Sequence, residues 1–319
     1  MSVGGADAAD AIVEPGGATP VPVSPEDLPD AELRELERMV ELALEQGEES
    51  HLAVLGYGEM SLVLGWPGDR PRFACKRLPV FRSRDQFERY RRTFDDYIEA
   101  LRGTGVHTVD SSLRPVGRGD GTVAGYAVQP VVPATTLAPN LLLQSDPAEG
   151  HPLVAAVVDT AAAVVDPQLG IDAQLANWTW EDGLLGYLDL TTPMLWSADG
   201  QALLDVDLLV RPAPWVFRGA IKRFLAPRIL DGYRDLRGVY LDLCGNLIKQ
   251  GLRPWLPAFL ERVNRHLERP MTPDEVHRYY RSDARLWGML LRIRRLDRAW
   301  QRNVRRRPYP FLLPREIKR

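Results

Sequence analysis

Three oxygen-bearing side chains within residues 170–189 constrain the fold of this chain more than any other feature. Asp172 is followed five positions later by Asn177, and Asp189 ends the segment. Between Asn177 and Asp189, two short apolar runs flank an Asp-Gly turn, a pattern that predicts a β-hairpin. A hairpin brings its two ends side by side, so we expect the three side chains to converge. Their oxygens are ligands that Mg²⁺ accepts, usually together with phosphate oxygens.

The composition is that of an ordinary globular protein. The chain has 319 residues, of which 45% are hydrophobic and 26% charged, enough for one large domain or two small ones. Cys75 and Cys244 provide neither a disulfide framework nor metal-ligand spacing, which predicts a reducing, cytoplasmic compartment. No apolar run approaches the roughly 20 residues of a membrane span, and no secretory signal is recognisable, so we expect no transmembrane segment.

Two segments precede the main domain. Residues 1–23 are rich in Gly, Ala and Pro without any periodicity, and we expect them to be disordered. Residues 24–50 contain an acidic helix over 30–46, which we expect to pack on the domain that follows. Its apolar positions recur at helical spacing: Leu33, Leu36, Val40 and Leu44.

A glycine turn opens the next segment, residues 51–132. Gly56 and Gly58 stand between two apolar runs, which predicts a strand, a turn and a second strand. Glycines let the backbone approach a ligand closely, and exposed N–H groups there can cradle phosphate. Lys76 follows inside a short predicted strand. The alternative for Lys76 is a position on the solvent face of an edge strand.

The spacing of apolar residues over 83–103 predicts one amphipathic helix, which Ser83 can cap. Its apolar stripe consists of Phe87, Tyr90, Phe94, Ile98 and Leu101. A strand predicted over 122–130 ends in a proline cluster that marks a domain boundary. Beyond it, a buried helix is expected over 153–165, a strand over 202–209, and helices over 214–226, 228–251, 254–267 and 273–280.

The order of these features resembles the protein-kinase-like superfamily, which includes protein kinases and aminoglycoside or choline phosphotransferases. The resemblance implies an α+β, two-lobed fold. Its N-lobe, residues 51–132, would be a small antiparallel β-sheet with one helix. Its C-lobe, residues 133–280, would be mostly helical and carry the catalytic loop.

The resemblance also implies ATP and Mg²⁺ as cofactors and a role for each matching residue. Asp172 would take or orient the proton of the substrate hydroxyl, while Asn177 and Asp189 would hold the metal. Lys76 would position the phosphates and pair with an acid of the helix over 83–103. We expect that acid to be Asp95, with Glu88 and Glu99 as alternatives. The nucleotide-binding residues would be Gly56, Gly58, Ser61, Val63, Lys76, Asp95, Gln129 and Val131.

The flanking residues depart from protein kinases. Gly170 and Ile171 precede Asp172, where protein kinases have His-Arg and small-molecule phosphotransferases often have His-Gly. Leu190 and Thr191 follow the second aspartate in place of Phe-Gly, and there is no long activation loop. The chain is therefore most similar to the small-molecule branch. The implied function is ATP-dependent transfer of phosphate to a hydroxyl of a small-molecule substrate. The alternative is a pseudokinase-like nucleotide-binding or scaffold protein.

Residues 281–319 are expected to form a basic C-terminal helix or tail. Its basic residues include Arg285, Arg292, Arg294, Arg295, Arg298, Arg302, Arg305, Arg306, Arg307, Arg315, Lys318 and Arg319. Apolar residues recur between the arginines over 286–300. Such a helix can lie on an anionic membrane surface or bind nucleic acid. The alternative is a helix docked on the domain, with its arginines solvated or paired with the acidic N-terminal helix.

Overall fold

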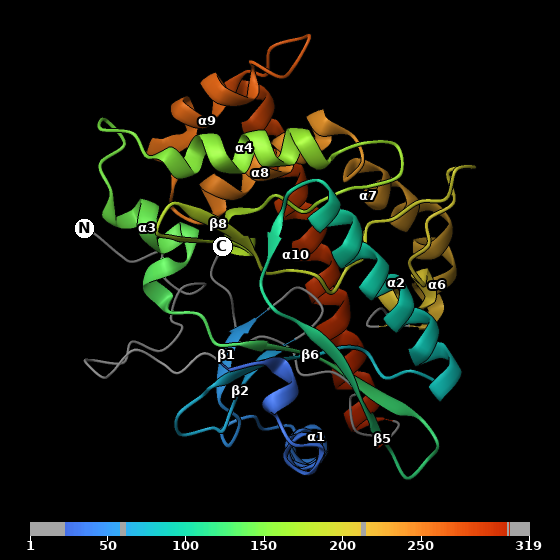
Figure 1. Ribbon diagram of the computed structural model, residues 1–319. Coiled ribbons are helices and arrows are strands. Elements are labelled where there is room, and N and C mark those ends of the chain that lie inside the picture. Colours follow the sequence, from blue (N-terminus) through green and yellow to red (C-terminus); the bar gives the residue numbers. More distant parts are fainter. Residues whose placement is uncertain (1–22, 58–61, 212–214, 305, 307–319) are drawn as a thin grey trace, which may run out of the picture.

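The chain folds into an antiparallel five-stranded sheet, a small three-stranded sheet and a large set of helices, an α+β architecture (Figure 1). The structure is a computed structural model that describes residues 23–57, 62–211, 215–304 and 306. The predicted disorder of residues 1–23 therefore falls almost entirely outside the described residues. None of the helices within the described ranges has the length and apolar character needed to cross a membrane.

The five-stranded sheet has the order β1-β2-β3-β6-β5, with every neighbouring pair antiparallel. Its strands are β1 Val54–Tyr57, β2 Leu62–Trp66, β3 Phe73–Arg77, β5 Ser112–Gly117 and β6 Val123–Pro130. The two strands predicted around the glycines, β1 and β2, pair with each other, and β2 also pairs with β3, which carries Lys76. Because β3 lies between β2 and β6, Lys76 does not belong to an edge strand.

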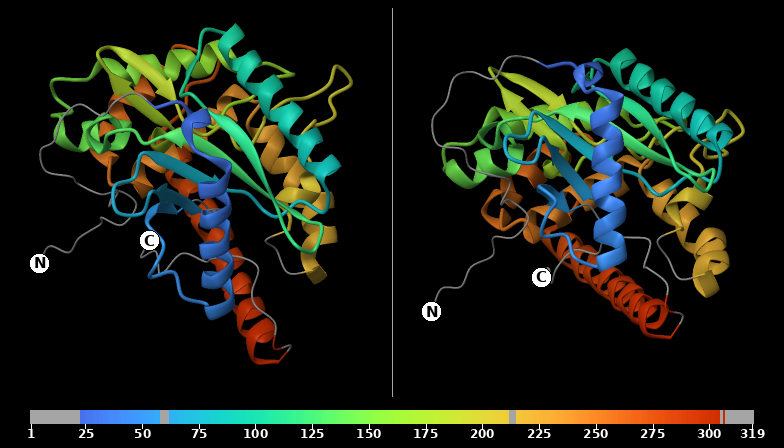
Figure 2. Two further views of the ribbon diagram at one scale, coloured as in Figure 1. Left: turned by 60° about the horizontal axis from the view of Figure 1, so that its bottom comes forward. Right: turned by 90° about the horizontal axis from the view of Figure 1, so that it is seen from below.

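Helix α1, Asp30–Gln46, covers one face of this sheet, as Figure 2 shows. The helix ends at Gly47, whose φ of 74° is the left-handed conformation that glycine adopts readily. The buried side chains of α1 form a hydrophobic cluster with the sheet, and this confirms that the acidic helix packs on the following domain. Preceding α1 is a short 3-10 turn, Pro25–Asp27.

A buried ion pair fixes α1 to the sheet. The carboxylate of Glu37 accepts two hydrogen bonds from Arg77, both at 2.7 Å, and one from the Tyr126 hydroxyl at 2.6 Å. Only 4% of the Glu37 side chain and 10% of the Arg77 side chain are exposed. Since successive residues of a strand point to opposite faces, Arg77 faces α1 and its neighbour Lys76 faces the other side of the sheet.

Helix α2, Arg84–Gly103, packs on the opposite face and joins the sheet to the main core. The predicted cap is confirmed, because the Ser83 hydroxyl accepts a hydrogen bond from the backbone N–H of Gln86. The predicted apolar stripe is buried, and Tyr97 extends it.

The small sheet has the strand order β4-β8-β7. It joins β4, which follows α2, to the hairpin of β7 and β8. Strand β4 is His107–Thr108, β7 is Trp178–Glu181 and β8 is Leu184–Tyr187. The predicted hairpin of β7 and β8 is confirmed. Asp182 and Gly183 both have positive φ angles, 50° and 83°, as the tight Asp-Gly turn requires.

Helices make up most of the remaining chain. They are the 3-10 turns Ala134–Thr136, Leu175–Asn177 and Arg253–Trp255, the π-helical turn Ile221–Leu225, and the α-helices α3 Ala138–Gln144, α4 Pro152–Val164, α5 Val206–Leu209, α6 Trp215–Ala220, α7 Ala226–Gly232, α8 Leu236–Lys249 and α9 Leu256–Val263. The strand predicted over 202–209 is wrong. Asp205 caps α5 there by accepting a hydrogen bond from the N–H of Asp207, and this favours a helical turn.

The last described helix, α10, runs continuously over Pro273–Asn303. The expected boundary between residues 280 and 281 is therefore wrong, since it falls inside this helix. Figure 2 shows α10 extending to the lower edge of both views. Its first turn packs near α8 and contains a capping box in which Thr272 and Glu275 bond reciprocally.

Replacing Glu275 by glutamine is expected to lower the melting temperature at neutral pH. It should also make the melting temperature fall less as the pH is lowered. Hydrogen bonds from Arg237 and from the N–H of Thr272 lower the pKa of Glu275 to about 2, against an ordinary value of 4.5. A carboxyl whose folded-state pKa is lowered stabilises the fold above its unfolded pKa. That contribution is lost as the pH falls toward about 2.

The measurement is the melting temperature of both proteins from neutral pH down to about pH 2. Glu261→Gln is the matched control, because Glu261 also bonds an arginine but is 72% exposed. Parallel curves for wild type and Glu275→Gln would contradict the prediction.

Candidate functional site

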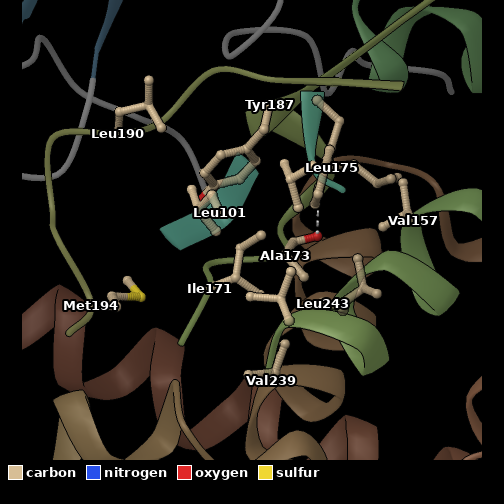
Figure 3. Close-up of a cluster of buried hydrophobic side chains, with 14 of the residues drawn as sticks. Leu101, Val157, Ile171, Ala173, Leu175, Tyr187, Leu190, Met194, Val239 and Leu243 are labelled. Carbon is tan, nitrogen blue, oxygen red and sulfur yellow. Dashed lines mark hydrogen bonds between the residues drawn. The ribbon is translucent and has the colours of Figure 1, made fainter. Parts of the chain in front are cut away.

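The segment 171–175 crosses the main core with alternate residues buried (Figure 3). Ile171, Ala173 and Leu175 are 0%, 2% and 1% exposed. In an extended segment, alternate side chains point to opposite sides. The burial of these three residues therefore directs Asp172 and Gln174, both half-buried, away from the core.

Gly170 lets this segment approach the helical core. A Cβ atom at this position would lie 2.5 Å from the backbone oxygen of Tyr233, closer than any side chain can come. The carbonyl of Gly170 accepts a hydrogen bond from the Tyr97 hydroxyl at 3.1 Å. Close packing thus accounts for the glycine two positions before Asp172.

Backbone and side-chain hydrogen bonds bring the segments of Asp172, Asn177 and Asp189 together. The side-chain nitrogen Nδ2 of Asn177 donates to the carbonyl oxygen of Asp172 at 3.1 Å. The N–H of Leu188 donates to the carbonyl of Asn177 at 2.9 Å. The hydroxyl of Tyr187 also donates to the carbonyl of Asp172, at 3.2 Å. Because Nδ2 of Asn177 is engaged, its oxygen Oδ1 is directed away from the Asp172 carbonyl.

Lys76 forms an ion pair with Asp189 across the junction between the sheet and the hairpin. Its Nζ lies 2.8 Å from Oδ1 of Asp189, and both side chains are about three-quarters buried. The N–H and hydroxyl of Thr191 donate to the same oxygen. Burial by itself raises the pKa of Asp189, but Lys76 and Thr191 outweigh it and lower that pKa. All three bonds reach Oδ1, and no described residue bonds to Oδ2.

The expected pairing of Lys76 with Asp95 is wrong, since Asp189 is the carboxylate that Lys76 contacts. Asp95 follows the buried Phe94 on α2, so the helical rotation of about 100° per residue carries it to the exposed side. Partial burial and the neighbouring carboxylates raise the pKa of Asp95, although Arg91 lowers it. The alternative Glu88 pairs with two arginines of α2 instead.

Tyrosines, not acids, extend from α2 toward the site. The hydroxyl of Tyr90 donates to the carbonyl of Thr191 at 2.6 Å, and that of Tyr97 donates to Gly170. The two tyrosines therefore support the segments that carry Asp189 and Asp172. Sequence reasoning assigned Tyr90 only to the apolar stripe, because a buried hydroxyl gives no signal of its partner.

The predicted glycine turn lies only partly within the described residues, and Gly56 belongs to strand β1 instead of the turn. Gly56 in β1 pairs with Val63 in β2, while Gly58 and Ser61 lie outside the described residues. Val63 in turn pairs with Lys76 on β3. Strand β2 thus lies between β1, which contains Gly56, and β3, which carries the lysine.

Gln129 and Val131, which the resemblance implies as nucleotide-binding residues, are engaged within the protein. The side chain of Gln129 donates to the hydroxyl of Ser111 and to the carbonyl of Leu188, both at 2.8 Å. The N–H of Val131 donates to the carbonyl of Arg72 at 2.9 Å. The Val131 N–H is therefore unavailable as a donor for adenine in this arrangement.

A half-buried acid behind the loop was missed from the sequence. Asp242 on α8 accepts hydrogen bonds from Gln174 at 2.8 Å and from the Tyr279 hydroxyl of α10 at 2.9 Å. Burial raises the pKa of Asp242. The hydrogen bonds from Tyr279 and Gln174 lower this pKa, and the nearby carboxylate of Asp283 raises it. The available signal was an aspartate inside the mostly apolar run 239–247.

The donor atoms around Asp189 suit a hard cation that also binds phosphate. In the described ranges, no three His, Cys, Asp or Glu side chains cluster as a metal site. Mg²⁺ bound with nucleotides, however, typically uses only one or two protein carboxylates, with phosphate and water oxygens completing its shell. Oδ2 of Asp189 and Oδ1 of Asn177 fit that smaller requirement.

Comparison with families of known proteins gives a match over most of the chain. Residues 35–298 match a family described as a family of unknown function (DUF6206). A search of curated proteins found no match. The matched range begins within α1 and ends within α10, and it includes every site residue discussed above.

Proposed function

The chain belongs to the DUF6206 family, and we propose that it transfers a phosphate from ATP, with Mg²⁺, to a hydroxyl of a small molecule. The observation that carries the proposal is the 2.8 Å contact between Lys76 and Asp189. A lysine from the sheet and an aspartate from the hairpin meet at one point, beside the segment of Asp172. A two-lobed kinase-like arrangement accounts for this meeting of residues that are 113 positions apart.

Each residue has a distinct role in the proposed reaction. The ammonium group of Lys76 binds and orients phosphate oxygens, and Asp189 with Asn177 holds the metal. When bound, Mg²⁺ neutralises charge on the phosphate oxygens. Asp172 accepts or orients the proton of the acceptor hydroxyl. Positioning and charge neutralisation supply most of the catalysis in phosphoryl transfer.

Adenine would find its hydrogen-bond donor one residue beyond the expected one. Pro130 and Pro133 have no N–H, and that of Val131 is engaged. Val132 is half-buried, and its N–H has no hydrogen-bond partner among the described residues. The backbone of Val132 is therefore the group that we assign to the adenine contact.

Lys76→Ala is expected to weaken Mg²⁺·ATP binding by about tenfold to a hundredfold, because a hydrogen bond to a charged group contributes on the order of 1.5–3 kcal/mol. The measurement is calorimetric titration of Mg²⁺·ATP into the folded variant. Lys222→Ala is the matched control, since Lys222 also pairs with an aspartate at 2.8 Å but is half exposed. Equal affinity of the two variants for Mg²⁺·ATP would reject the role of Lys76.

A nucleotide-binding scaffold without phosphotransfer is the second candidate. One observation favours it: among the described residues, Lys76 has no acidic partner on α2. The two candidates differ in one measurement. A screen of small-molecule alcohols for ATP consumption detects turnover by a phosphotransferase, whereas a scaffold binds the nucleotide and leaves it intact.

A further inference from the structure

One face of α10 presents arginines and large apolar side chains together to solvent. Its residues follow one another at intervals of three or four, so they form a single stripe. We call this stripe the exposed α10 face; it consists of Arg278, Arg281, Arg285, Met289, Arg292, Leu296 and Trp300. All of them are exposed, and Met289, Leu296 and Trp300 are 52%, 71% and 40% exposed.

From Arg278 to Trp300 the charge on this face is of one sign, and the exposed acid Asp274 lies one turn before it. Among the described residues, none of its four arginines forms an ion pair with a carboxylate. The acids of α10 beyond Glu275 are Asp283 and Asp297, which are half-buried and lie on the other side of the helix. The expected alternative, arginines paired with the acidic helix α1, does not apply to this face. Three acids of α1 pair instead with Arg38, with Arg77 of β3 and with Arg118, which follows β5.

We propose that the exposed α10 face docks the protein on an anionic lipid surface. Arginines near such a surface are attracted by its negative potential. An amphipathic helix lies in the interface with its apolar side chains inserted, and tryptophan is enriched at that depth. Met289, Leu296 and Trp300 provide the inserted groups, and the four arginines flank them.

Two features favour a lipid surface over a nucleic acid as the partner. Phosphate contacts of nucleic acid need cations but leave three large apolar side chains exposed to water, whereas a bilayer covers both kinds of group. The position of α10 is also suitable. Figure 2 shows its last turns extending beyond α1 and the five-stranded sheet, at the margin of the described structure. The proposal does not depend on phosphotransfer activity.

The test measures co-sedimentation of the full-length protein with vesicles. Wild type is expected to bind vesicles that contain phosphatidylserine, to bind phosphatidylcholine vesicles weakly, and to lose binding as salt screens the charges. Replacing Arg281, Arg285 and Arg292 together by glutamine is expected to weaken binding roughly a hundredfold, at about fivefold for each arginine. The matched control replaces three other exposed arginines that form no ion pair within the described ranges, Arg92, Arg228 and Arg253.

A second variant separates lipid insertion from charge alone. Met289→Ser with Leu296→Ser keeps every arginine and is expected to weaken vesicle binding about tenfold or more, because apolar burial is lost. Circular dichroism checks that each variant remains folded. Absence of wild-type binding to anionic vesicles would overturn the proposal. So would equal losses in the two arginine variants, or duplex DNA binding tighter than vesicle binding and unaffected by the serine pair.

Discussion

Asp172→Asn is expected to lower the rate of phosphate transfer by roughly 10² to 10⁴, the usual contribution of a general base. The affinity for Mg²⁺·ATP should remain close to that of wild type, because Asp172 acts on the acceptor hydroxyl. Asn177 and Tyr187 bond the backbone carbonyl of Asp172, and the N–H of Gln174 donates to Oδ1 of its carboxylate at 3.1 Å. The first two bonds do not depend on the carboxylate, and Oδ1 of an asparagine can accept the third, so the exchange should leave the segment in place.

Asp189→Asn should have the opposite signature. It removes one negative charge from the metal shell, and a neutral amide binds a hard cation less well than a carboxylate does. Nucleotide binding should therefore lose most of its dependence on Mg²⁺. Titration of ATP with and without Mg²⁺ into both variants, alongside single-turnover rates, distinguishes the roles. If nucleotide binding by Asp189→Asn depends on Mg²⁺ as strongly as binding by the wild type does, Asp189 does not hold the metal.

Glu37→Ala is expected to lower the free energy of unfolding by about 3–5 kcal/mol, because it leaves the buried guanidinium of Arg77 without its carboxylate. The Tyr126 hydroxyl loses its acceptor in the same change. Urea unfolding monitored by tryptophan fluorescence measures the loss. Glu41→Ala is the control, since Glu41 pairs with Arg118 but is 38% exposed, and a surface pair contributes about 0–1 kcal/mol.

A double variant shows whether the effect comes from the unpaired charge. Glu37→Met with Arg77→Met removes both charges and should recover much of the stability lost in Glu37→Ala. If Glu37→Ala costs no more than Glu41→Ala, the contact between α1 and the sheet does not contribute as expected.

The sequence was most informative where local chemistry decides the structure. The Asp-Gly turn predicted the hairpin of β7 and β8, and the Ser83 cap predicted the start of α2, because turns and caps depend on neighbouring residues. The partner of Lys76 could not be predicted in the same way. Asp95 has a suitable sequence interval, but the rotation of α2 in the assembled fold carries it to the surface. Contacts between distant segments depend on packing that no local pattern specifies.

The same limit applies to Asp242. An aspartate inside an apolar helix indicates a polar contact in the core, but its partners, Gln174 and Tyr279, come from residues 68 positions before it and 37 after it. Likewise, the continuity of α10 through residue 281 could not be inferred from the change to basic residues. Arginine is a good helix former, so the change in charge did not signal a change in secondary structure.

Two contacts between the sheet and the segment after β8 determine how the proposed site would exchange its ligands. Lys76 binds Asp189, and Gln129 binds the carbonyl of Leu188. A nucleotide whose phosphates take the place of Asp189 at Lys76 binds only molecules in which that ion pair is broken. Its apparent dissociation constant is then the intrinsic one divided by the fraction of such molecules. Association would reach a maximum rate set by the opening of the ion pair, and adding more nucleotide would not increase it.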